Sequence, residues 1–490
     1  MTTPEPIAVG GRRVLVVGLG RRGGGEGVVR YLAGRGAVLT VADAASAEAL
    51  AEPIARLADL PDITFALGSP EPPDPAGFDL VIRNPAVPQE ASVLQAARAA
   101  GVPIHTEASV FVQDWPGRIV GITGSKGKTS TAFFAFHLLG GEAAGAVLAG
   151  NMGGSSLDDI GLAGADTVAV FEFSSFQTET LGERGLSIDV ACLTTLHPDH
   201  QDRYATPHDY YAAKAPLFRL LADDAWRVHE PPDRLPAGFM AGAGGRWFCI
   251  GAHEPSADAA IWEEEGDIVV RIEGWETTLV ARADVPVEGD HRLQNALVAA
   301  AAALVCGVDP ATVRARLGNL PVVPHRMEPI PVPGRRRWIN DTAATNPTAA
   351  AGSLRSAAAE GTVTILCGGA PKGLDPAPLV DALVELRPAI VLLPGRESAL
   401  IATHLDAAGI AYDGPVGSMP EAVAVAAAQA TDIVLLAPGA SSFDGFVDEF
   451  DRGGQFIAEV LALHGVAITD DLGARLRQSR RGPIADLLAT

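Results

Sequence analysis

One stretch of sequence decides the fold of the chain's central part: Gly121-Ile122-Thr123-Gly124-Ser125-Lys126-Gly127-Lys128-Thr129-Ser130. It follows the apolar run 118–120 and precedes the helical run 131–140. Between a strand and a helix, glycines let backbone N–H groups close around phosphate oxygens, and the helix N-terminus adds a partial positive charge. Residues 121–130 are therefore predicted to form a phosphate-binding loop, here called the phosphate loop.

The side chains of the phosphate loop fit a nucleotide. Lys128 is placed to reach the terminal phosphates, and the Thr129 hydroxyl to coordinate the Mg²⁺ that accompanies ATP. The strict Walker pattern would need glycine where Ile122 stands, so the loop matches G-x-x-G-x-x-G-K-T better. We expect ATP to contact Gly124, Ser125, Lys126, Gly127, Lys128, Thr129 and Ser130.

Short apolar runs alternate with Ala-rich helical stretches along the whole chain. They fall into three groups, which are RRVLVVGLG, AVLTVAD and FDLVIRN, then GRIVGITG, DTVAVFEFSS and IDVACLTTL, then TVTILCGG, AIVLLPG and DIVLLAPG. This pattern predicts an α/β fold of parallel sheets with helices on both faces. Between the second and third groups, GRWFCI, DIVVRI and TTLVAR predict a small antiparallel patch.

The length agrees with three groups, because 490 residues at roughly 100–200 per domain suggest about three domains. Proline interrupts the pattern near residues 114–117 and 321–324, which gives the expected boundaries. We expect a Rossmann-like domain at 1–113, a central P-loop ATPase domain at 114–322 and a second Rossmann-like domain at 323–490.

Composition and charge narrow the partners and the compartment. A formal net charge of −22 disfavours wide docking on nucleic acid or on an anionic membrane. The cysteines, Cys192, Cys249, Cys306 and Cys367, form no CxxC pair and are expected to be buried thiols. With no signal-peptide pattern and no long apolar run, we expect a cytoplasmic protein, and nothing demands more than a monomer.

Polar residues follow two further strands of the second group. Glu172 ends the strand-like run 166–171, where an α/β sheet binds ligands and where a Mg²⁺ ligand is expected. The next strand leads into His197-Pro198-Asp199-His200-Gln201-Asp202-Arg203-Tyr204. Beside a phosphate loop and Glu172, this segment is a candidate second metal or substrate site.

The first domain has its own glycine-rich loop, Gly18-Leu19-Gly20-Arg21-Arg22-Gly23, with Asp43 after the next strand. As a bare pattern, GxGxxG with a later acidic residue also describes a dinucleotide-binding domain. A nicotinamide-dependent oxidoreductase is therefore an alternative of a different class. A second nucleotide loop and a set of Mg²⁺ ligands, which a dehydrogenase does not use, weigh against it.

Several segments together resemble the Mur ligase family. They are GITGSKGKTS, the E-x-SSFQ segment from Glu172, DHQDRY, PHRME at 324–328, NDTAATNP at 340–347 and APGASSFDGF at 437–446. The resemblance runs in one order from about residue 14 to about residue 460. It implies an enzyme with a UDP-linked precursor on the first domain, ATP on the second and an amino acid mainly on the third.

The resemblance also implies a reaction, in which ATP phosphorylates a substrate carboxylate and an amine attacks the acyl phosphate. The expected activity is the addition of D-glutamate to UDP-N-acetylmuramoyl-L-alanine in peptidoglycan precursor synthesis. An enzyme that adds L-glutamate to the same precursor stays open. A folate polyglutamate ligase is disfavoured by SSFQ and the first domain, and a non-catalytic binding module by the residues that a reaction needs.

Roles for individual residues follow from the same resemblance. Thr129 and Glu172 would bind one Mg²⁺, and His200 with a carbamylated Lys214 a second, while Lys128 contacts the phosphates. Further nucleotide contacts are expected at Asn295, Arg326 and Asp341. The expected precursor contacts are Gly18, Leu19, Gly20, Arg21, Arg22, Gly23, Asp43, Asn84, Asn151, Ser174 and Gln177. Those expected for the amino acid are Thr345, Lys372, Ser442 and Phe443.

Some positions depart from the family pattern. Ala343 replaces a lysine near the expected amino-acid site, and Arg292 replaces an asparagine near the adenine. Glu449 and Phe450 show that the second aromatic of the 446–453 run is displaced by one position. Lys126 stands in the phosphate loop where asparagine is more usual. The reaction type is thus better supported than the identity of the amino acid.

Overall fold

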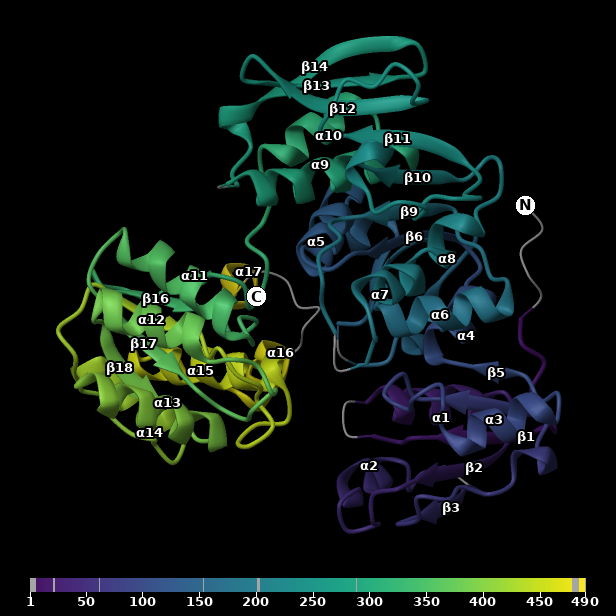
Figure 1. The fold of residues 1–490 in the computed structure, drawn as a ribbon, viewed down its shortest axis with the longest axis horizontal. Coiled ribbons are helices and arrows are strands. Elements are labelled where there is room, and N and C mark those ends of the chain that lie inside the picture. The colour runs from purple at the N-terminus through teal and green to yellow at the C-terminus, as the bar shows by residue number, and fades with distance from the viewer. Residues whose placement is uncertain are drawn as a thin grey trace. The chain divides into compact units, whose positions relative to one another are not determined.

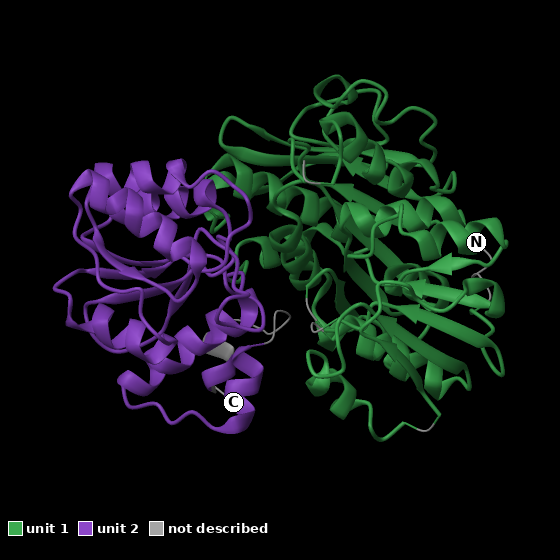
Figure 2. Ribbon diagram, turned by 60° about the horizontal axis from the view of Figure 1, so that its bottom comes forward, with its two compact units in different colours: residues 1–321 green, residues 322–490 purple. Residues whose placement is uncertain are grey.

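The structure, a computed structural model, describes residues 6–20, 23–60, 62–152, 154–200, 203–287, 289–477 and 484–489. It forms two compact units, residues 1–321 and 322–490 (Figure 2). Each unit is described by itself below. The domain boundaries predicted within residues 1–321 stay a prediction.

The first part of the N-terminal unit is a parallel sheet in the order β3-β2-β1-β4-β5. Strands β1, β2, β3 and β5 are labelled in Figure 1. This is a doubly wound order, whose direction reverses between β1 and β4. The elements are β1 (Arg13–Val17), α1 (Gly24–Gly34), β2 (Val38–Asp43), α2 (Ala51–Arg56), β3 (Thr64–Leu67), β4 (Leu80–Arg83), α3 (Ser92–Ala99), β5 (Ile104–His105) and α4 (Glu107–Asp114).

The rest of the unit is built on a larger sheet, in the order β14-β13-β12-β11-β10-β9-β6-β8-β7. Its strands are β6 (Arg118–Thr123), β7 (Ala146–Gly150), β8 (Val168–Glu172), β9 (Val190–Leu193), β10 (Trp226–His229), β11 (Arg246–Ile250), β12 (Ala259–Glu264), β13 (Asp267–Ile272) and β14 (Trp275–Ala281). Its helices are α5 (Lys128–Leu139), α6 (Ser175–Arg184), α7 (Pro207–Lys214), α8 (Pro216–Arg219), α9 (Asp290–Val305) and α10 (Pro310–Leu317).

The predicted antiparallel patch is present in β12–β14, but one segment assigned to it was wrong. β12 pairs antiparallel with β13, and β13 with β14. The GRWFCI segment forms β11, which pairs parallel with both β10 and β12. A long connection, residues 230–245, separates β10 from β11, and a parallel pair requires such a crossover.

An apolar core joins the two sheets of the N-terminal unit. Phe111 of α4 packs on Trp115, with ring centroids 4.8 Å apart, and on Phe171 of β8, at 4.9 Å. All three side chains are at most 1 % exposed. Helix α4 is fixed at its start by a capping box between Thr106 and Ser109. This continuous core explains why residues 1–321 form one compact unit.

The C-terminal unit is a third α/β sheet, in the order β15-β16-β19-β17-β18, with β15 antiparallel. Its elements are β15 (Glu328–Ile330), β16 (Arg337–Asn340), α11 (Pro347–Ala358), β17 (Val363–Cys367), α12 (Ala377–Leu386), β18 (Ala389–Leu392), α13 (Arg396–Ala408), α14 (Met419–Ala428), β19 (Ile433–Leu436), α15 (Glu449–Leu463), α16 (Asp470–Leu476) and α17 (Ile484–Ala489). The α/β fold class with parallel sheets is confirmed.

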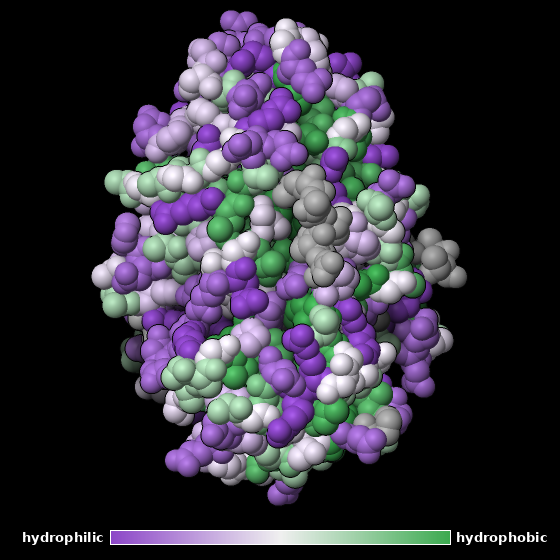
Figure 3. Space-filling view, turned by 90° about the vertical axis from the view of Figure 1, so that its right-hand side faces the viewer, coloured by the Kyte–Doolittle hydropathy of each residue, from purple (hydrophilic) through white to green (hydrophobic). Residues whose placement is uncertain are grey.

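The surface is largely polar on the face drawn in Figure 3, where hydrophobic side chains are scattered among hydrophilic ones. Within the described ranges, no helix is both long enough and apolar enough to span a lipid bilayer. The four cysteines are free, and three of them are buried, while Cys306 is partly exposed.

Candidate active site

The phosphate loop connects β6 to α5, as predicted, and the segment after β9 anchors it. The Ser125 hydroxyl donates to the backbone oxygen of His197 at 2.7 Å, and the Ser125 amide to that of Thr195 at 2.7 Å. The Thr194 hydroxyl donates to the backbone oxygen of Lys126 at 2.5 Å. Both β8 and β9 flank β6 in the sheet, so their polar ends meet the loop.

Gly127 begins α5 in a left-handed conformation, with φ of 85°. A Cβ at this position would lie 2.3 Å from Asn295 Oδ1, which is a clash. Asn295 is on α9 and only 6 % exposed. The structure therefore brings this predicted nucleotide residue directly against the phosphate loop.

The lysines of the phosphate loop point in different directions. Lys128 Nζ donates to the backbone oxygens of Gly124 and Ser125, at 3.0 and 3.2 Å. Lys126 Nζ lies 3.0 Å from Asp199 Oδ2. Burial raises the pKa of Asp199, but the hydrogen bond and charge of Lys126 outweigh it, so the pKa is lowered overall. Lys126 thus ties the phosphate loop to the segment that carries His200.

Glu172 ends β8 with an unsatisfied carboxylate oxygen. The side chain is 2 % exposed, and its Oε2 is buried without a hydrogen-bond partner among the described residues. Its Oε1 accepts a long hydrogen bond from Asn151 Nδ2, at 3.4 Å. Because a buried carboxylate oxygen without a partner is costly, this atom fits a metal ligand.

Lys214 ends α7 with a buried side chain. Its side chain is 1 % exposed and its Nζ lies 4.6 Å from the centre of the Tyr210 ring and 3.5 Å from Thr123 Oγ1. Burial lowers the pKa of Lys214 well below its usual range, and the nearby charge of Lys128 lowers it further. Its burial shows that Lys214 is not a solvated surface lysine.

His200 faces the same aromatic side chain as Lys214. Its ring lies 5.7 Å from that of Tyr210 and 5.2 Å, edge on, from that of Phe176. The backbone of His200 has φ of 52°, a left-handed conformation that is uncommon outside glycine but that histidine adopts more often than most residues. His200 and Lys214 thus both lie against the Tyr210 ring.

Members of the metal set predicted from sequence lie on neighbouring elements. Thr129 lies in the first turn of α5, Glu172 on the neighbouring strand, and Glu172 and Lys214 interact electrostatically. Across the described ranges, no group of three or more His, Cys, Asp or Glu side chains could hold a metal ion. The predicted set contains two such residues, Glu172 and His200, and its other members are Thr129 and Lys214.

The glycine-rich loop of the first domain lies where its sheet reverses direction, between β1 and β4. Asp43 Oδ2 accepts hydrogen bonds from the amides of Leu19 and Gly20, at 2.9 and 3.2 Å. Asn84 follows β4, and a Cβ on Gly18 would lie 2.9 Å from its Cβ. Asp43 thus supports the loop itself, rather than being left free to bind a ribose.

Other predicted precursor residues are placed as follows. Gly23 is the N-cap of α1. Ser174 and Gln177 form the capping box of α6, with the Ser174 amide 2.8 Å from Gln177 Oε1. Their observed contacts are therefore those of helix capping. The predictions for Arg21 and Arg22 lie outside the described residues.

The predicted amino-acid residues meet at the carboxyl edge of the C-terminal sheet. Lys372 Nζ donates to Thr345 Oγ1 at 2.8 Å. Ala370 and Ser441 form an antiparallel bridge, which places Ser442 beside the Lys372 loop. Ser442 is 2 % exposed and its Oγ has no partner among the described residues, whereas Phe443 is 56 % exposed. An unsatisfied hydroxyl there suits a polar ligand.

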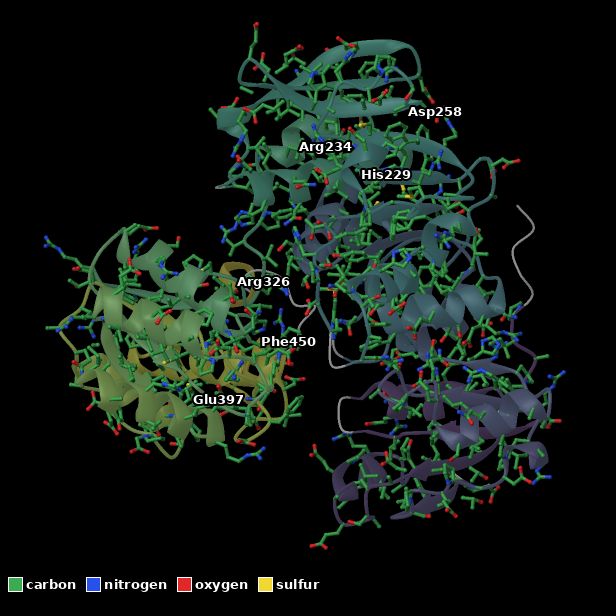
Figure 4. All side chains as sticks on the ribbon, in the orientation of Figure 1. His229, Arg234, Asp258, Arg326, Glu397 and Phe450 are labelled. Atoms are coloured by element: carbon green, nitrogen blue, oxygen red, sulfur yellow. The ribbon has the colours of Figure 1, made fainter. Side chains whose placement is uncertain are left out.

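The nucleotide residues predicted in this unit are also close together. Asp341 Oδ1 accepts from the amide of Met327, which follows Arg326, at 3.0 Å. Arg326 is exposed, whereas Asp341 is 6 % exposed. Figure 4 shows Arg326 and Phe450 in this unit, and the Phe450 ring lies 5.6 Å from that of His325.

Sequence reasoning missed Arg452 of α15. Its side chain is 0 % exposed, and it donates to Thr342 Oγ1 at 3.0 Å, to the Thr342 carbonyl at 3.1 Å and to the Ala440 carbonyl at 3.3 Å. Arg452 thus ties the loop of Thr345 to that of Ser442. No local sequence signal could have revealed this, because its partners lie 110 and 12 positions away.

Comparisons with known proteins agree with this geometry. Family models match residues 12–106, described as Mur ligase MurD-like, N-terminal domain, and residues 122–303, described as Mur ligase middle domain. A UDP-N-acetylmuramoylalanine--D-glutamate ligase of Roseiflexus sp. (strain RS-1) is 37% identical over 92% of this chain and 98% of its own. A UDP-N-acetylmuramoylalanine--D-glutamate ligase from Geobacter metallireducens is 32% identical over 93% of this chain and 99% of its own.

Solved structures of other Mur ligases share the fold. The UDP-N-acetylmuramate-alanine ligase MurC from Thermotoga maritima gives a TM-score of 0.56 at 18% identity, over 92% of this chain and all of that one. MurF from Acinetobacter baumannii gives a TM-score of 0.52 at 17% identity, over 87% of this chain and 90% of that one. With relatives above 30% identity along nearly their whole length, the chain belongs to the Mur ligase family, in the branch with a MurD-like N-terminal domain.

Proposed function

We propose that this chain catalyses the ATP-dependent addition of D-glutamate to UDP-N-acetylmuramoyl-L-alanine, releasing ADP and phosphate. The observation that carries the proposal is the near-full-length similarity to D-glutamate ligases, at 30–37% identity in the most similar relatives. The geometry of the phosphate loop, of Glu172 and of Lys214 also fits the ATP and Mg²⁺ chemistry that this reaction needs.

The phosphate loop would bind the nucleotide through its backbone amides and Lys128. The N-terminus of α5 points at this loop, so its partial positive charge favours the β- and γ-phosphates. The terminal phosphoryl group passes to the alanine carboxylate of the precursor. Attack of the glutamate amine on this acyl phosphate forms the amide bond and breaks the bond between the acyl carbon and the phosphate oxygen.

The residues around Glu172 fit bound Mg²⁺. The unsatisfied Glu172 Oε2 and the Thr129 hydroxyl would hold one ion, and His200 with a modified Lys214 a second. When bound, Mg²⁺ neutralises the phosphate and carboxylate charges that the reaction brings together. Asn151, which contacts Glu172, would orient that carboxylate.

Lys214 is suited to carbamylation. Its lowered pKa favours the uncharged amine, and an uncharged amine adds to CO₂ with loss of one proton. The product is a carbamate, whose oxygens can bind a cation, whereas an ammonium would repel it. The charge of Lys128 would stabilise the carbamate in this buried position.

The C-terminal unit would bind the incoming glutamate. Lys372 and Thr345 offer a cation and a hydroxyl for one carboxylate, and the unsatisfied Ser442 hydroxyl can donate to the other. At Ala343 a second cation of the family pattern is missing, so this site recognises its ligand with one lysine fewer.

The alternatives are less well supported. A nicotinamide enzyme would need Asp43 free for a ribose, whereas its Oδ2 accepts from the loop amides of Leu19 and Gly20 and its Oδ1 from the Ala45 amide. L-Glutamate carries the same groups as D-glutamate, but the relatives compared above are D-glutamate ligases. We further propose that the enzyme acts as a monomer in the cytoplasm, where ATP and the UDP-linked precursor are available.

The test is phosphate release from ATP with UDP-N-acetylmuramoyl-L-alanine and Mg²⁺, run with D-glutamate, L-glutamate or no amino acid. The proposal expects release that depends on D-glutamate, with a product heavier by one glutamyl residue. Release that depends on L-glutamate instead would overturn the stereochemistry. Release with neither enantiomer would overturn the substrate assignment.

A further inference from the structure

Glu179 of α6 is the shared partner of three polar side chains. Its Oε1 accepts from the Tyr204 hydroxyl at 2.8 Å, and its Oε2 lies 3.3 Å from Arg203 Nη2 and 3.9 Å from Arg83 Nη2. Arg203 and Tyr204 belong to the segment that carries His200, and Arg83 ends β4 of the first sheet. One carboxylate thus joins α6, the His200 segment and the strand that precedes Asn84.

Arg203 extends this contact in two directions. Its Nη1 donates to the backbone oxygen of Pro85 at 3.4 Å, next to Asn84. Its guanidinium lies 4.1 Å from the centre of the Phe176 ring, and the Phe176 ring meets His200 edge on at 5.2 Å. A continuous series of contacts therefore runs from the first sheet through Arg203 and Phe176 to His200.

The buried guanidinium of Arg83 is stabilised by the negative charge of Glu179. Its side chain is 0 % exposed, and it donates to Thr180 Oγ1 at 3.1 Å and to the backbone oxygens of Phe176 and Val87, at 3.3 and 3.0 Å. Burial lowers the pKa of Arg83, so this guanidinium needs an anion nearby. Only Glu179 forms an ion pair with it in the part of the chain that the structure describes.

We propose that Glu179 is a positioning residue for the reaction. It fixes Arg203 and Tyr204, which orients His200 for Mg²⁺ and substrate, and through Arg83 it links that orientation to the precursor-binding end of β4. The inference rests on the proposed function, in which His200 binds Mg²⁺. Glu179 itself touches no reacting atom in this scheme.

The test compares Glu179→Gln with Glu183→Gln. Glu183 lies one turn further along α6 and also pairs with an arginine of the first sheet's helices, Arg98 of α3, at 3.1 Å. Among the described residues, the hydrogen bond and ion pair of Glu183 are with Arg98 and not with the His200 segment. The two variants remove the same charge from the same helix. Each also breaks an ion pair between α6 and an arginine of the first sheet or its helices, Arg83 for Glu179 and Arg98 for Glu183.

We expect Glu179→Gln to lower kcat about 10- to 100-fold and to raise the Mg²⁺ concentration for half-maximal activity several-fold. The KM for ATP should stay within about threefold, because the phosphate loop is anchored by residues 194–197 and Asn295. Glu183→Gln should change none of these values by more than about twofold. A wild-type kcat and Mg²⁺ dependence in Glu179→Gln, or an equal loss in both variants, would overturn the proposal.

Two further measurements keep the test decisive. Should Glu179→Gln not fold, Tyr204→Phe removes only the hydroxyl that donates to Glu179, and the same loss of kcat, smaller in size, is expected. The imidazole resonances of His200, in protein with labelled histidine, should shift in Glu179→Gln and not in Glu183→Gln. Unchanged resonances would refute the positioning role. This readout needs no turnover, so it separates failure of the inference from failure of the proposed function.

Discussion

The ammonium of Lys372 donates a hydrogen bond to Thr345 Oγ1 across 2.8 Å, although 27 positions separate the two residues in the sequence. Lys372 follows β17 and Thr345 follows β16, and β19 lies between these strands. The contact therefore crosses over the carboxyl end of β19, next to the unsatisfied hydroxyl of Ser442. A cation held in this way is oriented before any ligand arrives.

Lys372→Met should weaken glutamate binding with little effect on the nucleotide. A charge-assisted hydrogen bond contributes about 1.5–3 kcal/mol, so the KM for D-glutamate should rise roughly 10- to 100-fold. Thr345→Val, which keeps the shape and removes the hydroxyl, should raise it about threefold. Initial rates over a range of D-glutamate and ATP concentrations measure both. An unchanged KM for glutamate in Lys372→Met would remove this residue from the site.

Lys214→Met should abolish most of the activity without lowering the stability of the fold. Methionine removes a buried amino group while filling most of its volume, so the thermal midpoint should stay equal or rise. Phosphate release should fall at least about 100-fold, because the carbamate oxygens are lost. In Lys214→Ala, short carboxylic acids should restore part of the rate by occupying the space. Wild-type turnover in Lys214→Met would show that no carbamate is needed.

Gly127→Ala should impair the phosphate loop beyond the cost of its backbone conformation. The new Cβ would approach Asn295 Oδ1 to 2.3 Å, at φ of 85°. Gly145→Ala is the matched control, since Gly145 has φ of 74° but nothing within 4 Å of a Cβ. Both should lose about 1 kcal/mol of stability to strain. Only Gly127→Ala should weaken ATP binding, by about tenfold or more, in a nucleotide titration.

Arg452→Met should destabilise the C-terminal unit and its amino-acid site together. Burial lowers the pKa of Arg452 to about 10, and its donors satisfy backbone oxygens of two loops. Removing them leaves buried carbonyls without partners, at a cost of about 2–4 kcal/mol. Urea unfolding followed by circular dichroism should show this loss. The KM for D-glutamate should rise as well, because the Thr345 and Ser442 loops are no longer tied together.

The parts predictable from sequence are those whose chemistry is local. The phosphate loop needs only the glycines, Lys128 and Thr129 within ten residues, between a strand and a helix. Glu172 was predictable because it ends an apolar run, and the end of a parallel strand is where such sheets bind ligands. The three α/β sheets follow from apolar runs of strand length separated by helical stretches.

What could not be predicted depends on contacts between distant residues. Glu179 looks like an ordinary surface glutamate on a helix, and its role appears only when Arg83 and Arg203 are placed beside it. The parallel pairing of β11 was missed because a short apolar run does not reveal the direction of its neighbours. The burial of Lys214, which decides its chemistry, likewise depends on the packing of α7.

Acid should destabilise the N-terminal unit through a buried histidine. His229 is 1 % exposed and stacks on Trp247 with ring centroids 5.2 Å apart (Figure 4 labels His229), and burial lowers its pKa to about 4. In the unfolded chain the same group has a pKa near 6.5. Between these values the unfolded state binds more protons, so stability is complete above about pH 6.5 and is lost as the pH falls toward 4.

The size of this effect follows from the shift of 2.5 in pKa, the difference between 6.5 and about 4, and amounts to about 3 kcal/mol. His229→Phe keeps an aromatic ring against Trp247 but cannot titrate. Its free energy of unfolding should therefore fall by about 3 kcal/mol less than that of the wild type between pH 6.5 and pH 4, in urea titrations at each pH. His105, whose pKa burial also lowers to about 4, titrates in both proteins and cancels in the comparison. Equal pH dependence in the two proteins would mean that His229 is already protonated in the folded state or exposed to water.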